Sequence, residues 1–508
     1  MNAAEETKAP GIILEITVFT CGGLVMTYEI IGSRIVAPYI GTSTYIWTSL
    51  IGVILGALSL GYWLGGNMAD RRPNVRVLAS AIFASASLVS LTVLVKDVVL
   101  IGVSGMPIGL GLKAVLASLL LFAPASVALG FVIPYAAKLR VSSLATTGAS
   151  VGRLYALSTI GSIAGTFAAG FFLIPFVGSI RTLYLIAATL FILSFLLAVF
   201  SLTRLHLSAI TLFAFAVIGS EYSSHLLRTN AGVYEIDTEY SRVRVFETEH
   251  PRTGLKIRAM ATDPFSIQSG ILLDSDELAL EYTKFYHLAR HYQPNLEHSL
   301  MIGGAGYSFP KDYLRRYPDS RIDVVEIDPQ MTAIAREFFE LKDNDRLRIF
   351  HEDGRSFLRT AGSGQYDAVM MDAFGSLLNV PYHLTTIEAV GEIRRVLTDD
   401  GVVVFNLGSA ISGPAGMFLR AEIATYASVF GEVRLYKVLP STADGKLQNQ
   451  VIVACKVKCI TSSDSTDPII SDLLDNLYTA DITLDMPILT DDLVPVESYN
   501  SIAHSQRH

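Results

Sequence analysis

Short motifs at three successive strand ends carry residue types that can bind a nucleoside. The first, Gly303-Gly304-Ala305-Gly306, is a glycine-rich turn whose missing side chains let backbone N–H groups approach a ligand. Glu326 ends the next strand 20 residues after Gly306, at the spacing where a carboxylate can accept both ribose hydroxyls. Asp353 and Gly354 follow the third strand, where an acid can accept a hydrogen bond from the amino group of adenine. The three motifs together predict an adenosine pocket.

Two other interpretations apply to these residues. A nicotinamide site would require Gly-x-Gly-x-x-Gly, but the last position here is Phe309. The acids can also serve only as caps of helices and turns, which is the simpler interpretation of any one of them alone. A fourth strand ends at Asp372 in YDAVMMD, and an acid there points to where the reactive sulfur of a sulfonium nucleoside would lie.

Strands that alternate with helices must position these side chains. Apolar strands at SLMI, DVVEID, RLRIF, YDAVMMD and GVVVFNL alternate with helices expected at 277–292, 329–340, 354–360 and 385–396. This alternation predicts a parallel, doubly wound sheet, which binds ligands at the carboxyl ends of its strands. Before it, residues 232–275 alternate with period 2, which indicates a small antiparallel β unit.

The first 220 residues have a different composition. Six apolar runs are each long enough to cross a bilayer as a helix, at about 11–32, 45–68, 77–95, 114–136, 154–176 and 182–202. Six such runs within 200 residues are too many for the core of a soluble domain. Glu29 and Arg34 stand at the end of the first run, where they either form an ion pair near the interface or serve a site for a lipid or small molecule.

Basic loops predict the orientation of these runs. Arg71, Arg72 and Arg76 follow the second run, and Lys138, Arg140 and Arg153 lie between the fourth and fifth, so both loops and the N-terminus are expected in the cytoplasm. Six crossings leave the C-terminal domain in the cytosol, whereas seven leave it outside. We interpret the marginal run at 205–219 as interfacial or re-entrant. If 97–112 also enters the membrane, the count becomes eight.

Charge and cysteine content limit the class of protein further. Residues 1–220 hold 12 Lys and Arg against 6 Asp and Glu, whereas the remaining 288 hold 27 against 41. An acidic second half argues against nucleic acid and is compatible with a cationic substrate. Of three cysteines, Cys455 and Cys459 lie four apart in a predicted strand, too far apart for a strain-free bridge. We therefore expect a reduced, cytosol-facing domain, and no Cys/His spacing indicates a metal site.

Residues 230–460 resemble the spermidine synthase (polyamine aminopropyltransferase) family, a branch of the S-adenosylmethionine-dependent methyltransferase fold. With YEIIGSR, GYWLGGNMADRR and LTDDLVPVE, the whole chain resembles the membrane-fused version of that family. The resemblance implies transfer of an aminopropyl group from decarboxylated S-adenosylmethionine to an amine such as putrescine, which leaves methylthioadenosine. It implies a co-substrate rather than a tightly bound cofactor, and homodimers assembled around the β unit.

The resemblance also implies site residues. Gln268 matches the Gln of the family's DGxxQ stretch, and Tyr286 and His287 match its Tyr-His pair, although these two also suit a packed helix face. Glu326 matches the ribose acid and Asp353 the adenine-side acid. Asp372 matches the catalytic Asp, acting as base or amine anchor with help from Tyr286.

Several ammonium anchors of the family are replaced in this chain. Its Asp after the glycines is Gly306, its second acid after the catalytic Asp is Gly375, its Glu after Tyr-His is Leu288, and its late Tyr is Thr442. A diamine then needs other acids, for which the candidates are Glu235, Asp237, Asp491 and Asp492. Loss of the acid near the donor also removes a reason to reject the carboxylate of intact S-adenosylmethionine.

Three functions follow as hypotheses. The first is a membrane-bound aminopropyltransferase. The second is a methyl or alkyl transferase that uses S-adenosylmethionine on a lipid-soluble acceptor at the membrane. The third is a polyamine transporter or sensor regulated by its nucleoside domain.

The expected organisation has four parts. A polytopic α-helical membrane domain spans 1–220, and the small antiparallel β unit spans 221–276. The Rossmann-like, doubly wound α/β domain follows at 277–460, and an acidic C-terminal segment at 461–508.

Overall fold

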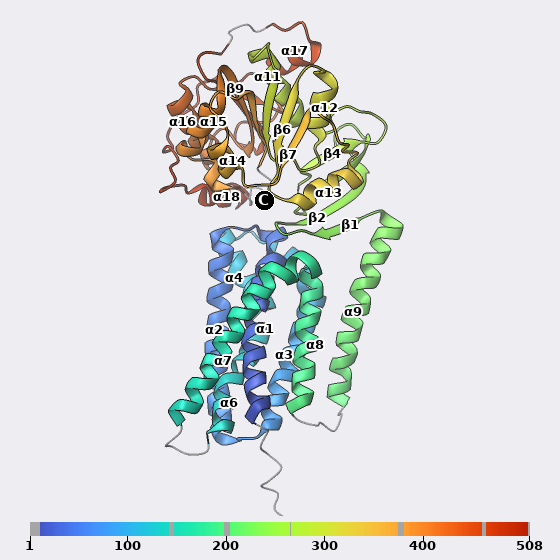
Figure 1. Ribbon diagram of the computed structural model, residues 1–508, viewed down its shortest axis with the longest axis vertical. Helices are drawn as coiled ribbons and strands as arrows, with labels where there is room; N and C mark the ends of the chain where they lie inside the picture. The colour runs from blue at the N-terminus through green and yellow to red at the C-terminus, as the bar shows by residue number, and fades with distance from the viewer. Residues whose placement is uncertain are drawn as a thin grey trace, which may run out of the picture. The chain divides into compact units, whose positions relative to one another are not determined.

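The computed structural model describes residues 11–141, 147–197, 204–264, 266–373, 380–459 and 464–505 (Figure 1). The chain divides into two compact units. Unit 1 consists of Met1–Ala231 with Asp237–Arg242, and unit 2 of Gly232–Ile236 with Val243–His508.

Unit 1 is helical. Its described helices are α1 (Gly11–Ile40), α2 (Thr44–Arg71), α3 (Val75–Ser104), α4 (Leu110–Leu121), α5 (Ala123–Gly130), α6 (Val132–Arg140), α7 (Thr147–Ala168) with its π-helical continuation η2 (Ala169–Val177), α8 (Ser179–Leu197) and α9 (Arg204–Ala231). Five are long and apolar enough to cross a membrane, or six if the bent α4–α6 stretch is one span. The six predicted runs fall on these helices. The stretch 97–112 instead forms the end of α3, the connection 105–109 and the start of α4.

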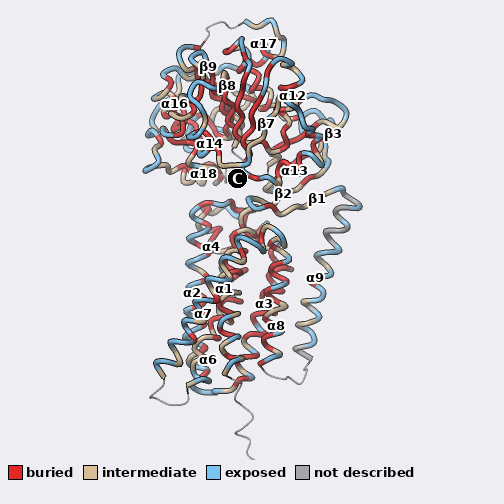
Figure 2. The backbone as a smooth tube through the Cα atoms, in the orientation of Figure 1, coloured by how far each residue is buried: buried red, intermediate tan, exposed pale blue. Residues whose placement is uncertain are grey.

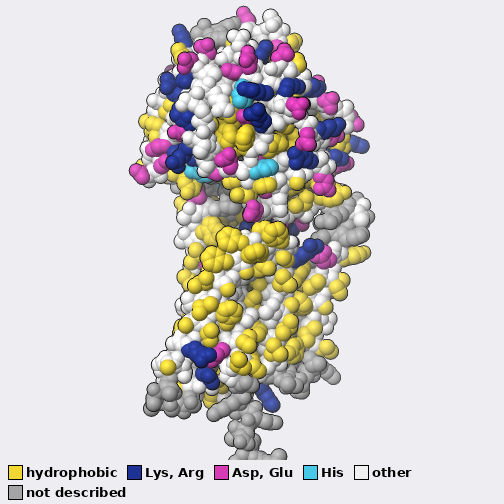
Figure 3. Space-filling model, viewed as in Figure 1, with side chains coloured by type: hydrophobic (Ala, Val, Ile, Leu, Met, Phe, Trp, Pro, Cys, Tyr) yellow, Lys and Arg dark blue, Asp and Glu magenta, His cyan; other side chains and the backbone are white. Residues whose placement is uncertain are grey.

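Apolar side chains cover much of the surface of unit 1, as the space-filling view shows (Figure 3). Trp63 is 65% exposed and Phe176 is 80% exposed, and exposed Ile, Leu and Val side chains surround them along the helices. Water would make so large an apolar surface unfavourable, so unit 1 is compatible with a lipid environment.

Helices α1 and α7 pack so closely that their contact requires glycine. A Cβ atom built on Gly161 would lie 1.9 Å from the backbone oxygen of Phe19, and one built on Gly165 would lie 2.2 Å from that of Gly23. Small residues at such crossings let two backbones approach within van der Waals contact.

Unit 2 begins with a four-stranded antiparallel sheet. Its strands lie in the order β1 (Tyr234–Asp237), β2 (Arg242–Glu249), β3 (Lys256–Ala261) and β4 (Ser269–Leu272). A helical segment follows as α10 (Glu281–Lys284), the 3-10 turn η3 (Phe285–His287) and α11 (Leu288–Tyr292). The predicted helix at 277–292 therefore begins later and changes its pitch at its centre.

The second sheet of unit 2 has seven strands in the order β10-β11-β9-β8-β5-β6-β7. These are β5 (His298–Ile302), β6 (Arg321–Val325), β7 (Leu347–Phe350), β8 (Tyr366–Met371), β9 (Leu397–Ser409), β10 (Arg434–Lys437) and β11 (Gln448–Cys455). The pairs among β5 to β9 are parallel, while β11 is antiparallel to both of its neighbours. Strands β6 and β8 pair with β5 on its two opposite edges, which creates a topological switch point at the carboxyl end of β5.

Helices cover both faces of this sheet, so the fold is doubly wound and Rossmann-like (Figure 2). One face packs α12 (Ser308–Arg316), α13 (Pro329–Phe338) and α17 (Pro468–Leu474), and the other packs α14 (Gly354–Thr360), α15 (Ile387–Val396), α16 (Met417–Phe430) and α18 (Val496–Ser505). Two short 3-10 turns, η4 (Tyr382–Leu384) and η5 (Pro414–Gly416), complete the described elements. Alternate residues of β5 show the pattern, since Met301 faces the first layer and Leu300 and Ile302 face the second.

The structure corrects the prediction about the cysteines. Cys455 and Cys459 form a disulfide, with their Cα atoms 5.1 Å apart. The prediction was wrong because it extended the strand through residue 459, whereas β11 ends at Cys455 and the chain bends at residues 456 and 457. The bend brings the two Cα atoms within the range that a disulfide needs.

The close contact of α1 with α7 gives a testable prediction about stability. Gly161→Ala should destabilise unit 1 by about 1–3 kcal/mol, because the added methyl group overlaps the Phe19 backbone. The measurement is thermal unfolding of the detergent-purified chain. Gly52→Ala is the matched control, since a Cβ there meets nothing within 4 Å and Ala favours the helix. Equal melting temperatures for the two variants would contradict the prediction.

Candidate active site

The glycine-rich turn connects β5 to α12 at the switch point. Gly303 has a φ of +96°, and its N–H donates to the carbonyl of Val325 at 2.8 Å. A Cβ atom on Gly303 would lie 2.4 Å from the backbone oxygen of Asp372. Both the backbone conformation and the close approach therefore require glycine at this position.

Glu326 holds the turn from the end of β6. Its Oε2 atom accepts hydrogen bonds from the N–H groups of Gly304 at 2.9 Å and Ala305 at 3.0 Å, and its Oε1 atom accepts one from Asp328 at 3.0 Å. Burial raises the pKa of Glu326, although these three hydrogen bonds act in the opposite direction. Each carboxylate oxygen has further acceptor capacity, which is what a pair of ribose hydroxyls would use.

Asp353 caps α14 and also contacts a histidine. Its Oδ1 atom accepts from the N–H of Ser356 at 3.0 Å, and its Oδ2 atom bonds Nε2 of His383 at 2.8 Å. Burial acts to raise the pKa of Asp353, but these hydrogen bonds bring it below its ordinary value. Gly354 lies against β5, because a Cβ there would be 2.7 Å from Cγ2 of Ile302. Asp353 therefore does cap a helix, as the simpler interpretation of this acid expects, and it also bonds His383.

Asp372 follows β8 and accepts hydrogen bonds from two side chains. Its Oδ1 atom accepts from Nδ2 of Asn406 at 3.2 Å, and its Oδ2 atom accepts from the Tyr282 hydroxyl at 3.5 Å. The Tyr286 hydroxyl donates to the backbone oxygen of the preceding residue, Met371, at 3.4 Å, and so lies close to the same carboxyl group. Burial raises the pKa of Asp372 to about 7, even though the polar groups of Tyr286, Asn406 and Tyr282 lower it. An acid with this pKa exchanges a proton near neutral pH.

Tyr282 and Asn406 were not identified from the sequence. Tyr282 lies one helical turn before Tyr286, and this spacing was available as a signal. Asn406 is a polar residue at the end of the apolar strand GVVVFNL, and its Oδ1 atom accepts from Nδ2 of Asn449 on β11 at 2.9 Å. A buried amide in an apolar strand is itself a signal, since it needs a partner.

The structure separates His287 from its neighbour Tyr286. Nδ1 of His287 bonds the Tyr317 hydroxyl at 2.9 Å, and Nε2 bonds Oδ2 of Asp312 at 2.8 Å. The ring is buried, and both of its nitrogens are engaged with partners in or just after α12. His287 therefore fixes α12 against the segment that carries Tyr286, rather than presenting a nitrogen to a substrate.

Gln268 and Gly306 are connected through Ser269, which follows Gln268 in the chain and lies beside Gly306. The Gln268 amide bonds the Thr262 hydroxyl, and its backbone oxygen accepts from the Tyr282 hydroxyl at 3.0 Å. A Cβ atom at Gly306 would lie 2.5 Å from Oγ of Ser269, which itself is 3.3 Å from Oγ of Ser308. Ser269 thus blocks the place where the family's Asp side chain would begin.

The other departures also have structural settings. Leu288 is buried in the core, and the backbone oxygen of Thr442 accepts from Lys437 at 2.7 Å. Gly375 lies outside the described residues. Of the candidate replacement acids, Glu235 pairs with Arg244 at 2.9 Å and Asp491 with Arg355 at 3.0 Å.

The other two candidate replacement acids, Asp237 and Asp492, have different surroundings. Asp237 belongs to unit 1, where it accepts from the N–H of Ser179 at 2.8 Å. Asp492 is exposed. Three of the four candidate acids are therefore engaged with other groups of the chain.

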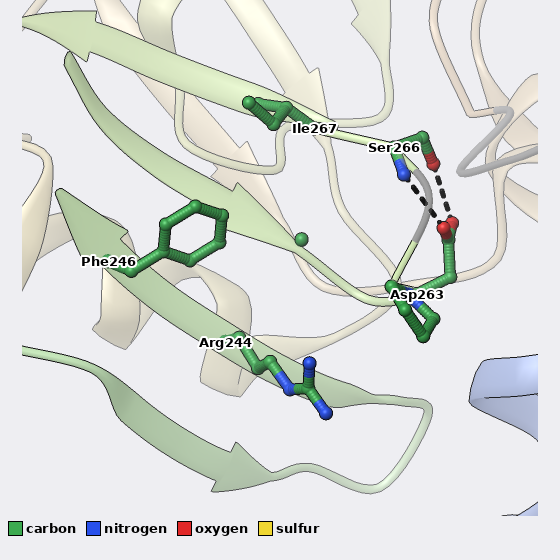
Figure 4. A pocket seen from close by; sticks show the side chains of 7 residues that line it. Arg244, Phe246, Asp263, Ser266 and Ile267 are labelled. Atoms are coloured by element: carbon green, nitrogen blue, oxygen red, sulfur yellow. Dashed lines mark hydrogen bonds between the residues drawn. The ribbon is translucent and has the colours of Figure 1, made fainter. Parts of the chain in front are cut away.

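A small pocket of about 180 Å³ lies in the β unit (Figure 4). Phe246 and Ile267 supply its apolar wall, while Asp263 accepts from the N–H of Ser266 at 2.9 Å and from its hydroxyl at 2.6 Å. Arg244 also lines the pocket. The segment that forms the wall continues directly into Gln268, so the pocket and Gln268 belong to one stretch of chain.

Comparison with known proteins finds similarities in the part of the chain that carries this site. Residues 280–436 match the family described as "Spermine/spermidine synthase domain". The polyamine aminopropyltransferase of Vibrio vulnificus is 36% identical over 149 residues, which cover 29% of this chain and 48% of the relative. That of Streptococcus uberis is 35% identical over 152 residues, which cover 28% of this chain and 51% of the relative. The chain thus spans about half the length of these curated relatives.

Among solved structures, a probable spermidine synthase from Corynebacterium glutamicum matches with a TM-score of 0.40 at 22% identity, over 46% of this chain and 83% of that one. Spermidine synthase from Thermotoga maritima matches with a TM-score of 0.34 at 19% identity, over 44% and 72%. The sequence matches show that residues 280–436 are similar to a spermine/spermidine synthase domain.

Proposed function

We propose that the chain is a membrane-bound aminopropyltransferase. It transfers the aminopropyl group of decarboxylated S-adenosylmethionine to an amine such as putrescine and releases methylthioadenosine. The observation that carries this proposal is the placement of Asp372, with its raised pKa, directly against the glycine-rich turn that Glu326 holds.

The donor site is the part nearest the turn. Glu326 would accept the ribose hydroxyls, and Asp353 with Gly354 would border the adenine. The family whose domain matches supports a co-substrate rather than a resident cofactor. Because Gly303 brings the turn against Asp372, a nucleoside bound there has its sulfur close to that acid.

The reaction needs a neutral amine and a base. The amine nitrogen attacks the aminopropyl carbon bonded to the sulfonium, a C–N bond forms, and the C–S bond breaks with its electron pair going to sulfur. The amine proton passes to the Asp372 carboxylate. The Tyr282 hydroxyl and the Asn406 amide hold this carboxylate in one orientation by donating hydrogen bonds to it.

Unit 1 would anchor the enzyme in a membrane. Its five apolar helices, or six with the bent stretch, and its apolar surface support this part of the proposal. With six crossings the transferase unit would lie in the cytosol, as expected from the sequence. Dimerisation around the β unit also stays a prediction.

A second candidate function rests on Gly306. At this position glycine replaces the family's Asp, which would attract a donor ammonium and repel a donor carboxylate, and Ser269 fills the space beside it. Intact S-adenosylmethionine would then be accepted, and the enzyme would transfer a methyl or other alkyl group to a lipid-soluble acceptor. A methyl transfer would leave S-adenosylhomocysteine.

Mass spectrometry of the nucleoside products distinguishes the two functions. Detergent-purified protein is given either donor, with and without putrescine or membrane lipid. We expect methylthioadenosine only when the decarboxylated donor and the amine are both present. S-adenosylhomocysteine from the intact donor would contradict aminopropyl transfer and favour the second function.

Replacement of the reacting acid should abolish most turnover. Asp372→Asn should lower kcat/KM about 10²–10⁴-fold, because the neutral amide cannot accept the amine proton. Steady-state kinetics gives this number, and the affinity for methylthioadenosine should change little. Asp343→Asn is the matched control, since its carboxyl group is 91% exposed. Full turnover by Asp372→Asn would refute the assigned role.

The raised pKa of Asp372 predicts how activity depends on pH. The base must be deprotonated, so kcat/KM should rise as pH increases through about 7, below the separate rise from deprotonation of the free amine at pH ~10. The Tyr282 hydrogen bond lowers this pKa, so Tyr282→Phe should move the rise to higher pH. A pH–rate profile of both proteins measures the shift, and a shift to lower pH would be inconsistent with this network.

A further inference from the structure

Helix α9 contacts α8 through its middle part, residues 213–221. Arg181 pairs with Glu221 at 3.2 Å, and the Tyr184 hydroxyl donates to the backbone oxygen of Ala216 at 3.2 Å. Farther along, the ring centroids of Phe191 and Phe213 are 5.6 Å apart. Residue numbers rise on α8 while they fall on α9, so the two helices are antiparallel neighbours.

The length of α9 is sufficient for a full crossing. Its 28 residues extend about 42 Å, whereas the hydrocarbon core of a bilayer is about 30 Å thick. The run at 205–219, which we interpreted as interfacial or re-entrant, lies within this one continuous helix. Helix α9 is not among the five or six helices that are apolar enough to cross a membrane by composition. With α9 added as a further crossing, because of its length and its contacts with α8, the total becomes seven.

The basic loops lie together at one end of unit 1. Glu15, in the second turn of α1, pairs with Arg153 at 2.8 Å and with Arg140 at 3.5 Å. Lys138 pairs with Asp70 at 2.6 Å, which brings the end of α6 to the end of α2. This end of unit 1 therefore contains the start of α1 and both predicted cytoplasmic loops.

The chain leaves α9 at the other end. The short segment Asp237–Arg242 belongs to unit 1, and Arg34 donates to the backbone oxygen of Thr238 at 2.5 Å. Asp237 accepts from the N–H of Ser179, the first residue of α8. The helix connections at 41–43, 105–109 and 178 contain no Lys or Arg. This end is thus opposite to the basic loops. Its three helix connections lack basic residues, whereas Arg34, Lys113 and Arg181 lie within the ends of the helices and Arg242 ends the segment Asp237–Arg242.

We propose that the transferase unit lies outside the cytoplasm. Basic loops remain on the cytoplasmic side of a membrane, and seven crossings place the chain after α9 on the opposite side. The inference rests on the proposed membrane anchoring, but it does not depend on which group the enzyme transfers.

The disulfide supports the same location independently. Disulfides form and persist outside the cytosol and are rare within it, where thiols are kept reduced. Cys455–Cys459 lies in unit 2, at the end of β11. The expectation of a reduced domain in the cytosol came from treating these residues as free thiols.

The location restricts the supply of substrates. Amines that reach the transferase unit come from the compartment outside the cytoplasm. The proposed sulfonium nucleoside must likewise be supplied on this face of the membrane.

Cysteine labelling in intact cells tests the inference. The full chain with Cys21→Ala carries either Asp343→Cys in unit 2 or Arg72→Cys in the basic loop, both at exposed positions, and is expressed in a bacterium with a permeable outer layer. A membrane-impermeant maleimide should label the first variant in intact cells and the second only after the cells are opened. The reverse pattern would place unit 2 in the cytosol and overturn the inference.

The native cysteines provide a second readout. In the Cys21→Ala chain, Cys455 and Cys459 should resist a permeant alkylating agent until a reductant is added. Free thiols in freshly quenched cells would overturn the inference. Labelling of the Asp372→Asn chain should be unchanged, so failure of the transfer chemistry is distinguished from failure of the topology. Loss of the chain from carbonate-washed membranes would overturn both the anchoring and the inference.

Discussion

The close approach of two strand ends is the constraint on which the candidate site depends. Gly303 at the end of β5 lies against the backbone oxygen of Asp372 at the end of β8, and the Asp372 N–H donates to the carbonyl of Ile302 at 2.8 Å. Any side chain at position 303 would separate the strands. This contact places the glycine-rich turn and Asp372 at one edge of the sheet, and Tyr282 and Asn406 then fix the orientation of the Asp372 carboxyl group.

Local sequence patterns were sufficient to predict the parallel sheet and the residues at its strand ends. The period of apolar residues identifies strands, and a residue that follows a parallel strand lies at the carboxyl edge of the sheet. The positions of Glu326, Asp353 and Asp372 at this edge could therefore be predicted from the sequence. The helix at 354–360 was predicted with its true bounds, because Asp353 is a strong N-cap and Gly354 starts the helix.

Features that depend on contacts between distant segments were not predicted. Asn406 reaches Asp372 only because β9 pairs with β8, and periodicity does not show which side chains meet across strands. His287 was grouped with Tyr286 by sequence adjacency, but their side chains have different partners. The bend after β11, which permits the disulfide, and the partnership of α9 with α8 are likewise tertiary effects.

The hydrogen bonds from the glycine-rich turn to Glu326 have a consequence for ligand affinity. Two N–H donors of the turn, those of Gly304 and Ala305, already order it without a ligand, so little conformational entropy would be lost when the proposed nucleoside binds. Under the proposed function, the turn would then contribute a similar affinity for every adenosine ligand. Discrimination among donors then falls to the few groups around Gly306 and Ser269, where one substitution is enough to change the preferred substrate without rebuilding the pocket.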